Sequence, residues 1–368
     1  MSLELTVSAP AKLFVAGEYA VTRGGSAVVA AVSRRVTCRV SARPGSGRIT
    51  VGHRSRTWSF GDDPGSAESA PVELRFAAFA AWLAARACGH RALDLDFETA
   101  GDLDEPGAEK TGLGGSAAAT VAVVAASFAA AGRDPAGERT LAERIATAVL
   151  AHRAAQGGGS AADVVASSCG GLSVVSGLER LPSPRSLAEA ADALRQALGA
   201  TVSVERLDLP RGLSFEAVAT GRAARTGPRA SRFSRGFDGP GRGVLEAWTE
   251  GMEHATRELV LALRSGVEEP VRRAFAASGR WLERLAPLLS MPILSARLRL
   301  ACEVARGASA VARVSGAGGG DCAIALVGDD RAMALRSAWR EAGLAPLAVA
   351  IDGGPRVEPP ATPGGRRG

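Results

Sequence analysis

The sequence predicts an α+β fold in two lobes. Its 368 residues, 46% of them hydrophobic and 22% charged, can bury a large core, and a chain of this length commonly divides into two domains. Segments that alternate apolar and polar residues, as strands do, are interspersed with segments of helical periodicity. The stretch "LERLPSPRSLAEAA", which contains two prolines, indicates the boundary. We therefore expect domains at residues 1–180 and 181–352.

The expected elements are separated by turn residues along the whole chain. In the first half they are strands at 3–21, 25–43 and 47–60, a helix from Pro71 to Cys88, a strand at 92–99, an alanine-rich helix, a helix at 137–156, a glycine-rich turn at 157–171 and a strand at 172–177. In the second half they are strands at 201–210 and 213–221, three helical segments between Val244 and Gly307, and a strand, helix and strand from 311 to 352. The Pro, Gly and Arg content from Gly353 predicts a disordered tail at 353–368.

Composition excludes several classes of protein. The first thirty residues do not resemble a signal peptide, and the longest apolar stretch, sixteen residues of mostly alanine, is short for a membrane span. Five cysteines without paired spacing predict reduced, mostly buried thiols, and four scattered histidines give no zinc or haem signature. We therefore expect a soluble, cytoplasmic protein that binds no membrane.

The net charge of +6 could suggest nucleic acid, but the basic residues are dispersed and a small anionic substrate explains the charge balance equally well, so we expect no nucleic-acid partner. Of the 44 basic residues, 42 are arginine and only Lys12 and Lys110 are lysine. A lysine kept against such a bias indicates a site that needs a compact, flexible ammonium. The only tyrosine, Tyr19, lies seven residues after Lys12.

The stretch "KTGLGGSAAAT", at residues 110–120, predicts a phosphate-binding turn. A glycine-rich turn that leads into a helix presents unpaired backbone N–H groups and the positive end of the helix dipole to an anion. Gly112, Gly114 and Gly115 let the main chain approach the phosphates. Ser116 can cap the helix or ligate a magnesium ion. The alternative is an ordinary capped core helix.

Three separated blocks resemble the GHMP kinase superfamily of small-molecule kinases. They are "PAKLFVAGEYAV", "KTGLGGSAAA" and "SGAGGGDCAIAL", and they frame residues 8 to 327. The chain is most similar to the phosphomevalonate kinase branch, because it has Glu-Tyr in the first block, Lys110 before the glycine turn and the segment "AHRAAQGGGSAADVVAS". The resemblance implies an N-terminal lobe like the second domain of ribosomal protein S5, a ferredoxin-like C-terminal GHMP lobe, and an active site between them.

The resemblance implies transfer of phosphate from ATP to the 5-phosphate of mevalonate, with Mg²⁺, in a monomer or homodimer. A second hypothesis is mevalonate kinase or another GHMP kinase with a different acceptor. A third is a non-catalytic ligand-sensing or RNA-binding protein that keeps the S5-like shell. The chain departs from the family pattern at Gly115, at Ala161 and at Arg313, where relatives often have serine, glycine and lysine respectively.

The site residues follow from the resemblance and from what phosphoryl transfer needs. Lys12, Lys110 and Asp163 are the expected catalytic residues: Lys12 at the reacting phosphates, Lys110 at the acceptor or the β- and γ-phosphates, and Asp163 orienting Lys12 and metal-bound water or taking a residual proton. Ser116 is the expected metal ligand. The expected ATP-binding residues are Gly112, Leu113, Gly114, Gly115, Ser116 and Ala117; the expected substrate-binding residues are Lys12, Tyr19, Lys110, Ser160, Gly316, Ala317 and Gly318.

Other polar residues of these motifs are expected to have structural roles. Glu18 is expected to support its turn, and Asp321 and Cys322 to be structural. His152 is expected to be packed within its helix. Arg222, Arg225 and Thr226 belong to an exposed basic loop that is also a candidate lid.

Overall fold

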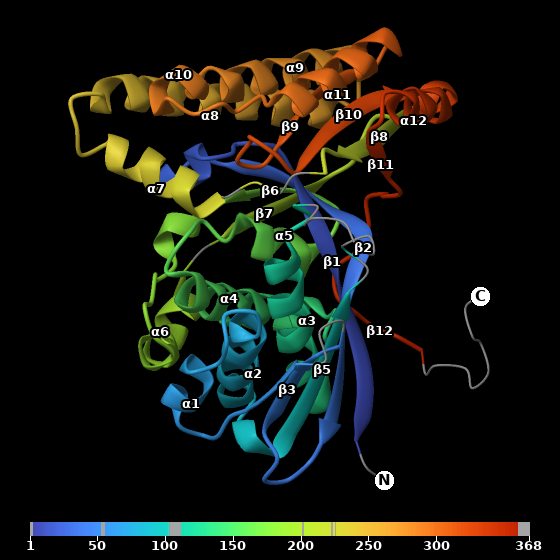
Figure 1. Cartoon of the computed structure of the whole chain (residues 1–368). Coiled ribbons are helices and arrows are strands. Elements are labelled where there is room, and N and C mark those ends of the chain that lie inside the picture. The colour runs from blue at the N-terminus through green and yellow to red at the C-terminus, as the bar shows by residue number, and fades with distance from the viewer. Residues whose placement is uncertain are drawn as a thin grey trace.

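The computed structural model describes residues 3–52, 56–101, 103, 112–200, 202–221, 224 and 226–359, and it contains two sheets with helices packed on them (Figure 1). The larger sheet runs β12-β1-β2-β5-β3-β4, and β6 and β7 extend it from β2. Its strands are β1 (Glu4–Ala16), β2 (Ala27–Ala42), β3 (Arg48–Val51), β4 (Arg56–Ser59), β5 (Leu95–Gly101), β6 (Leu172–Ser176), β7 (Ser203–Leu207) and β12 (Arg356–Val357). All of its pairs are antiparallel except β3 with β5.

Helices cover one face of this sheet (Figure 1). They are α1 (Pro64–Glu68), α2 (Arg75–Ala87), α3 (Gly115–Ala130), α4 (Glu138–Gln156), α5 (Ala162–Cys169) and α6 (Leu187–Gly199). Helix α3 packs against β1, β2, α2 and α4 and is buried along nearly its whole length, which small alanine side chains permit. Its N-terminus, where the glycine-rich turn ends, is thereby held beside β1.

The smaller sheet has the order β11-β8-β10-β9 and is antiparallel throughout. Its strands are β8 (Leu213–Ala219), β9 (Val311–Ser315), β10 (Cys322–Gly328) and β11 (Ala345–Leu347). The accompanying helices, most of which form a layer at the top of Figure 1, are α7 (Thr226–Gly236), α8 (Arg242–Ser265), α9 (Glu268–Glu283), α10 (Leu285–Leu289), α11 (Ala296–Gly307) and α12 (Ala332–Glu341). Short 3₁₀ turns lie at Ala20–Arg23, Ala92–Asp94, Leu178–Arg180 and Asp329–Arg331.

The α+β class and two-part arrangement expected from the sequence are confirmed, with local corrections. The segment 157–171 is not only a turn, because helix α5 occupies Ala162–Cys169; the Ser167 hydroxyl donates to the Pro10 carbonyl at 2.6 Å and fixes this helix on β1. Four helices, not three, lie between 242 and 307. The boundary between residues 180 and 181 stays a prediction, although β7, beyond it, extends the larger sheet.

The expectation of disorder from Gly353 is wrong for the first residues of that segment. Arg356 and Val357 pair with β1, and Arg35, which is 8% exposed, donates to the Asp352 carboxylate at 2.6 Å and to the Gly354 carbonyl at 2.8 Å. A buried guanidinium needs such acceptors, so it orders the chain that supplies them. Residues 360–368 lie outside the described residues.

Candidate active site

Lys12 lies on β1, directly against the glycine-rich turn of residues 112–116, which we call the N-lobe glycine loop. Its backbone N–H donates to the Leu113 carbonyl at 2.9 Å. Its aliphatic stem occupies the space beside Gly114, where an added Cβ would lie 2.5 Å from Lys12 Cε. Its ammonium lies 5.3 Å from the centre of the Phe14 ring. The loop and the lysine are therefore positioned by one another.

The N-lobe glycine loop leaves backbone donors unused. Gly114 precedes α3 in a left-handed conformation with φ of 77° and contributes no side-chain cap. Within the described part of the chain, the N–H groups of Gly114, Gly115, Ser116 and Ala117 have no hydrogen-bond partner, and the first helical bond is Ala118 to Gly114. Free N–H groups at the positive end of a helix form an anion site.

Ser116 is held by a histidine. His152 Nε2 on α4 lies 3.3 Å from Ser116 Oγ, and the imidazole ring stacks on Phe76 with ring centroids 4.9 Å apart. Burial lowers the pKa of His152, and the nearby Asp163 only partly opposes this shift. The imidazole is therefore neutral near pH 7, and the packed position expected from the sequence is confirmed.

Ser160 lies in the turn that leads into α5, and Asp163 lies in the first turn of that helix. The Asp163 carboxylate accepts the Val164 N–H at 3.0 Å, and Ser160 Oγ accepts the Ala162 N–H at 3.4 Å. Arg153 organises this turn from within. Its buried guanidinium donates to the carbonyls of Gly159, Ser160, Leu178, Leu181 and Pro182.

The second glycine-rich turn, residues 316–320, connects β9 to β10, and we call it the C-lobe glycine loop. It is attached to the end of β1, because the Tyr19 hydroxyl donates to the Ala317 carbonyl at 2.8 Å and the Gly316 N–H donates to Glu18 at 3.4 Å. On its other side, the Gly319 N–H donates to the Ile293 carbonyl at 2.7 Å. An added Cβ at Gly318 would lie 2.8 Å from Ile293, so only glycine fits there.

Glu18 and Arg313 form a buried ion pair between the two sheets. Glu18 is 3% and Arg313 1% exposed, and the guanidinium donates to both carboxylate oxygens, at 2.6 and 2.7 Å. Arg313 also donates to the Val15 carbonyl and the Ser278 hydroxyl. The supporting role expected for Glu18 is confirmed, and Arg313 is its partner.

Asp321 connects the two glycine loops. It has a φ of 58°, and an added Cβ at Gly112 would overlap its carboxyl group. Its carboxylate accepts the Ala224 N–H at 2.7 Å. Burial raises its pKa, against the opposing effects of that hydrogen bond and of the Lys12 and Arg229 charges. The structural role expected for Asp321 is thus confirmed, and it also places the loops in contact.

The structure brings most of the expected residues together. Lys12, the N-lobe glycine loop, Asp321 and the C-lobe glycine loop form one continuous set of contacts. Lys12 and Asp163 form no ion pair among the described residues, although both act on the pKa of His152. Cys322 is buried on β10, and Thr226 begins α7. Lys110, Arg222 and Arg225 lie outside the described residues.

Sequence reasoning missed two arginines. Arg153 organises the turn before α5, and Arg229 on α7 is only 8% exposed and overlaps the position that a Cβ at Gly319 would take. In a chain with 42 arginines among 44 basic residues, neither stands out by composition. The available signal was the spacing of "GPRASRFSRGF", which places Arg229 on the same helical face as the apolar Phe233.

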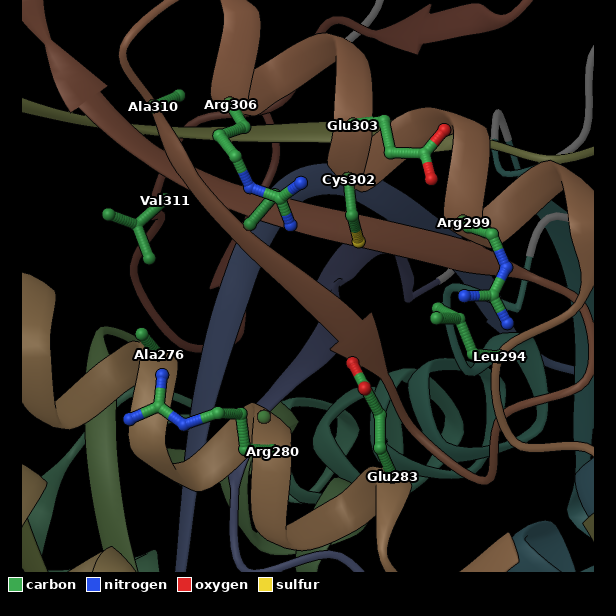
Figure 2. A pocket seen from close by; sticks show the side chains of 12 residues that line it. Ala276, Arg280, Glu283, Leu294, Arg299, Cys302, Glu303, Arg306, Ala310 and Val311 are labelled. Atoms are coloured by element: carbon green, nitrogen blue, oxygen red, sulfur yellow. The ribbon is translucent and has the colours of Figure 1, made fainter.

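A concavity of about 420 Å³ lies elsewhere, between α9 and α11 beside β9. Figure 2 shows Arg280 and Glu283 on one wall and Arg299, Glu303 and Arg306 on the other. None of the expected site residues lines it. Within the described residues, no cluster of three His, Cys, Asp or Glu side chains suits a metal ion, and no helix is both long and apolar enough to cross a membrane.

Comparison with known proteins places the chain in a family. Residues 75–171 match the family described as GHMP kinases N terminal domain, and residues 262–345 match GHMP kinases C terminal. The chain is 32% identical to phosphomevalonate kinase from Streptomyces sp. (strain CL190) over 362 residues, which cover 92% of this chain and 95% of that protein.

Two solved structures share the fold. A Lin0012 protein from Listeria innocua is 23% identical, with a TM-score of 0.83 over 97% of this chain and 99% of that one. Streptococcus pneumoniae phosphomevalonate kinase, in complex with phosphomevalonate and AMPPNP, is 21% identical, with a TM-score of 0.74 over 95% of this chain and 99% of that one.

Proposed function

This chain belongs to the phosphomevalonate kinase family within the GHMP kinases, and we propose that it transfers the γ-phosphoryl group of ATP to 5-phosphomevalonate, yielding 5-diphosphomevalonate. The observation that carries the proposal is the 32% identity to a phosphomevalonate kinase over 92% of the chain. The contact of Lys12 with a glycine loop whose N–H groups are free supports it, because phosphoryl transfer depends on positioning and charge stabilisation.

The N-lobe glycine loop would hold the ATP phosphates. The free N–H groups of Gly114 to Ala117 converge at the N-terminus of α3, where a phosphate chain replaces the missing hydrogen-bond acceptors. The Lys12 ammonium, whose stem lies along Gly114, would then face the transferring group. In this position its charge stabilises the negative charge that develops on the phosphoryl oxygens.

The donor set near Ser116 fits magnesium. This ion keeps several waters and binds mainly to substrate phosphates, so it needs few protein ligands. Ser116 Oγ stands at the helix terminus, half-buried and oriented by His152. When bound, the ion would neutralise part of the charge of the ATP phosphates.

The acceptor phosphate needs little help from a base. The second pKa of a phosphate monoester is about 6, so the group is largely deprotonated at neutral pH. The larger barrier is repulsion between two phosphates. We therefore assign Asp163 to orienting the site and Lys110, on sequence grounds, to the acceptor side. Tyr19 supports the C-lobe glycine loop, because its hydroxyl donates a hydrogen bond to the Ala317 carbonyl.

The assignment of Lys110 has its own test. At an effective dielectric of about 20, an ammonium roughly 4 Å from a phosphate charge contributes on the order of 4 kcal/mol before desolvation. Lys110→Ala should therefore raise the KM for phosphomevalonate by at least about tenfold. The dissociation constant of an ATP analogue, measured by calorimetry, should change little. If the analogue binds more weakly and the acceptor KM is unchanged, Lys110 belongs to the ATP side.

A coupled ADP-release assay with mevalonate, phosphomevalonate, homoserine and galactose tests the function. We expect kcat/KM for phosphomevalonate to exceed the others by at least about 100-fold, because an acceptor without a phosphate leaves a cation of the site unpaired. Faster phosphorylation of mevalonate would replace the proposal with the alternative acceptor. RNA retention on filters at two salt concentrations, without ADP release, would favour the non-catalytic alternative.

The proposal includes a cytoplasmic location and a monomer or homodimer.

A further inference from the structure

Arg229 is a buried cation without a carboxylate partner. The residue is 8% exposed, and its Nη1 donates to the Pro292 carbonyl at 2.9 Å. In the part of the chain that the structure describes, no carboxylate lies within ion-pair distance of it. Two other buried arginines, Arg35 at 8% and Arg313 at 1% exposure, each pair with a carboxylate at 2.6 Å. Because an unpaired buried charge is costly, a bound anion would stabilise Arg229.

The position of Arg229 shows where that anion would lie. The guanidinium rests on Gly319 of the C-lobe glycine loop, so that a Cβ there would overlap it. It also interacts with the Tyr19 hydroxyl: burial raises the pKa of Tyr19 to about 12, and the charge and hydrogen bond of Arg229 oppose that rise. Arg229 therefore lies where Tyr19, from the first of the three sequence blocks, meets the C-lobe glycine loop, which belongs to the third block.

The charges around Arg229 leave it available to a ligand. The carboxylate of Asp321 is near enough for the two groups to interact, but it accepts the Ala224 N–H and lies against Gly112. Lys12 acts on the same Asp321 carboxylate. Both cations therefore lie near Asp321, Lys12 at the N-lobe glycine loop and Arg229 at the C-lobe glycine loop. A substrate with anionic groups at both ends matches this arrangement.

We infer that Arg229 binds an oxyanion of the acceptor substrate and sets the preference for a doubly anionic acceptor. The inference rests on the proposed function, because phosphomevalonate carries a carboxylate at one end and a phosphate at the other. A guanidinium suits either group, since its planar N–H donors match two oxygens at once. Burial alone does not carry this inference: Arg144 is also buried without a carboxylate, but it bonds to Thr140 and Gly137 at the start of α4.

Steady-state kinetics of Arg229→Met test the inference. We expect the KM for phosphomevalonate to rise at least about tenfold, in line with loss of a hydrogen bond to a charged group, while the KM for ATP changes less than about threefold. The KM of Arg229→Lys for phosphomevalonate should lie between those of Arg229→Met and the wild type. Arg232→Met is the matched control, because Arg232 is exposed on the same helix, and both of its KM values should stay at the wild-type values.

Mevalonate as a competitive inhibitor identifies the group that is bound, because it keeps the carboxylate and lacks the phosphate. If Arg229 holds the carboxylate, Arg229→Met raises the inhibition constant by the same factor as the KM. If it holds the phosphate, the inhibition constant stays the same while the KM rises. Both results support the inference, and the KM alone decides it if mevalonate does not inhibit the wild type.

Three results would overturn the inference. The first is an unchanged KM for phosphomevalonate in folded Arg229→Met, and the second is a rise in the KM for ATP of equal or larger size. The third is a loss of activity that follows only the unfolded fraction in thermal melts, with both KM values unchanged, which would show a purely structural role. If the wild type itself does not phosphorylate phosphomevalonate, the proposed function fails instead, so the two failures are distinguishable.

Discussion

The two glycine-rich loops of the site differ in how their backbone groups are used. The N-lobe glycine loop, before α3, leaves the N–H groups of Gly114 to Ala117 without partners among the described residues. The C-lobe glycine loop, between β9 and β10, is attached to other parts of the protein. The Gly319 N–H donates to Ile293, the Gly316 N–H donates to Glu18, and the Ala317 carbonyl accepts from Tyr19.

Similar glycine-rich sequences therefore serve different purposes. In the N-lobe glycine loop, glycine brings the backbone itself to an anion, and the capacity to bind lies in main-chain donors at a helix terminus. Glycine makes room for neighbouring groups in both loops, for Lys12 at Gly114 and for Arg229 at Gly319. In the C-lobe glycine loop the Gly316 and Gly319 N–H groups are already bonded, so the capacity to bind lies in the adjacent side chain. Substitutions in the two loops should consequently affect different kinetic constants.

The largest effect is expected from the buried pair that holds the C-lobe glycine loop. Glu18→Gln leaves Arg313 buried at 1% exposure without a charged partner, and should reduce the free energy of unfolding by about 3–5 kcal/mol. Urea denaturation followed by circular dichroism measures this. Glu216→Gln is the control, because its partner Arg336 is 37% exposed and keeps access to water, so the loss should be near 1 kcal/mol.

The double variant Glu18→Gln, Arg313→Met separates pairing from packing. Its loss of unfolding free energy should be smaller than the sum of the losses in the two single variants, because no charge is left unpaired when both residues are changed. The folded fraction should bind an ATP analogue with an unchanged dissociation constant, since the N-lobe glycine loop does not depend on the pair. Equal losses in the Glu18 and Glu216 variants would show that the burial of Arg313 does not set the size of the effect.

A large effect is also expected from Lys12, on the N-lobe side of the comparison. Lys12→Met removes the ammonium beside Gly114 and should lower kcat by about 100-fold or more, the usual loss for one charge-stabilising donor. Analogue binding measured by calorimetry should change little, because the free N–H groups remain. A variant that keeps near-normal kcat would remove Lys12 from the transfer step.

The parts of the site that are local in sequence were predictable. The glycine turn, the helix after it and the contact with Lys12 follow from a short motif and from a lysine retained in an arginine-rich chain. The supporting role of Glu18 and the packing of His152 were predictable on the same basis, because each lies inside a motif with a distinct pattern. The strand and helix periodicities were sufficient for the fold class.

Contacts between distant segments were not predictable. The Glu18–Arg313 pair joins positions 295 residues apart, and nothing in the sequence around either residue indicates its partner. The segment of helix α5 resembles a turn in sequence because three glycines precede a helix of only eight residues. This helix is stabilised by the hydrogen bond from Ser167 to Pro10 on β1. Arg229 depends on a helix that packs over a loop some 90 residues later, at Gly319. Tertiary packing, not propensity, decides these features.

A glycine-to-alanine pair tests the comparison with a smaller effect. Gly114→Ala places a methyl group 2.5 Å from Lys12 Cε, and should lower kcat about tenfold through the displaced lysine. Gly319→Ala displaces Arg229, and should raise the KM for phosphomevalonate about tenfold with a smaller change in kcat.

Gly266→Ala is the control for this pair. Gly266 also has a positive φ, 66°, but a Cβ there meets nothing within 4 Å. It should therefore show the cost of left-handed strain, about 1–2 kcal/mol in stability, without a kinetic change. The same kinetic change in all three variants would show that strain, and not the displaced side chain, is the cause.

The smallest effect concerns a left-handed position that lacks a glycine. Ala161 has a φ of 60° and leads into α5. Left-handed geometry costs an alanine roughly 1–2 kcal/mol, so Ala161→Gly should relieve strain while losing a buried methyl group.

Ala162→Gly is the matched control, because Ala162 is also buried but begins the helix with ordinary geometry. In urea denaturation, Ala161→Gly should be more stable than Ala162→Gly by about 1–2 kcal/mol, with kcat near the wild-type value. Equal stabilities would show that the turn, which Arg153 holds through the Gly159 and Ser160 carbonyls, relaxes around Ala161 without strain.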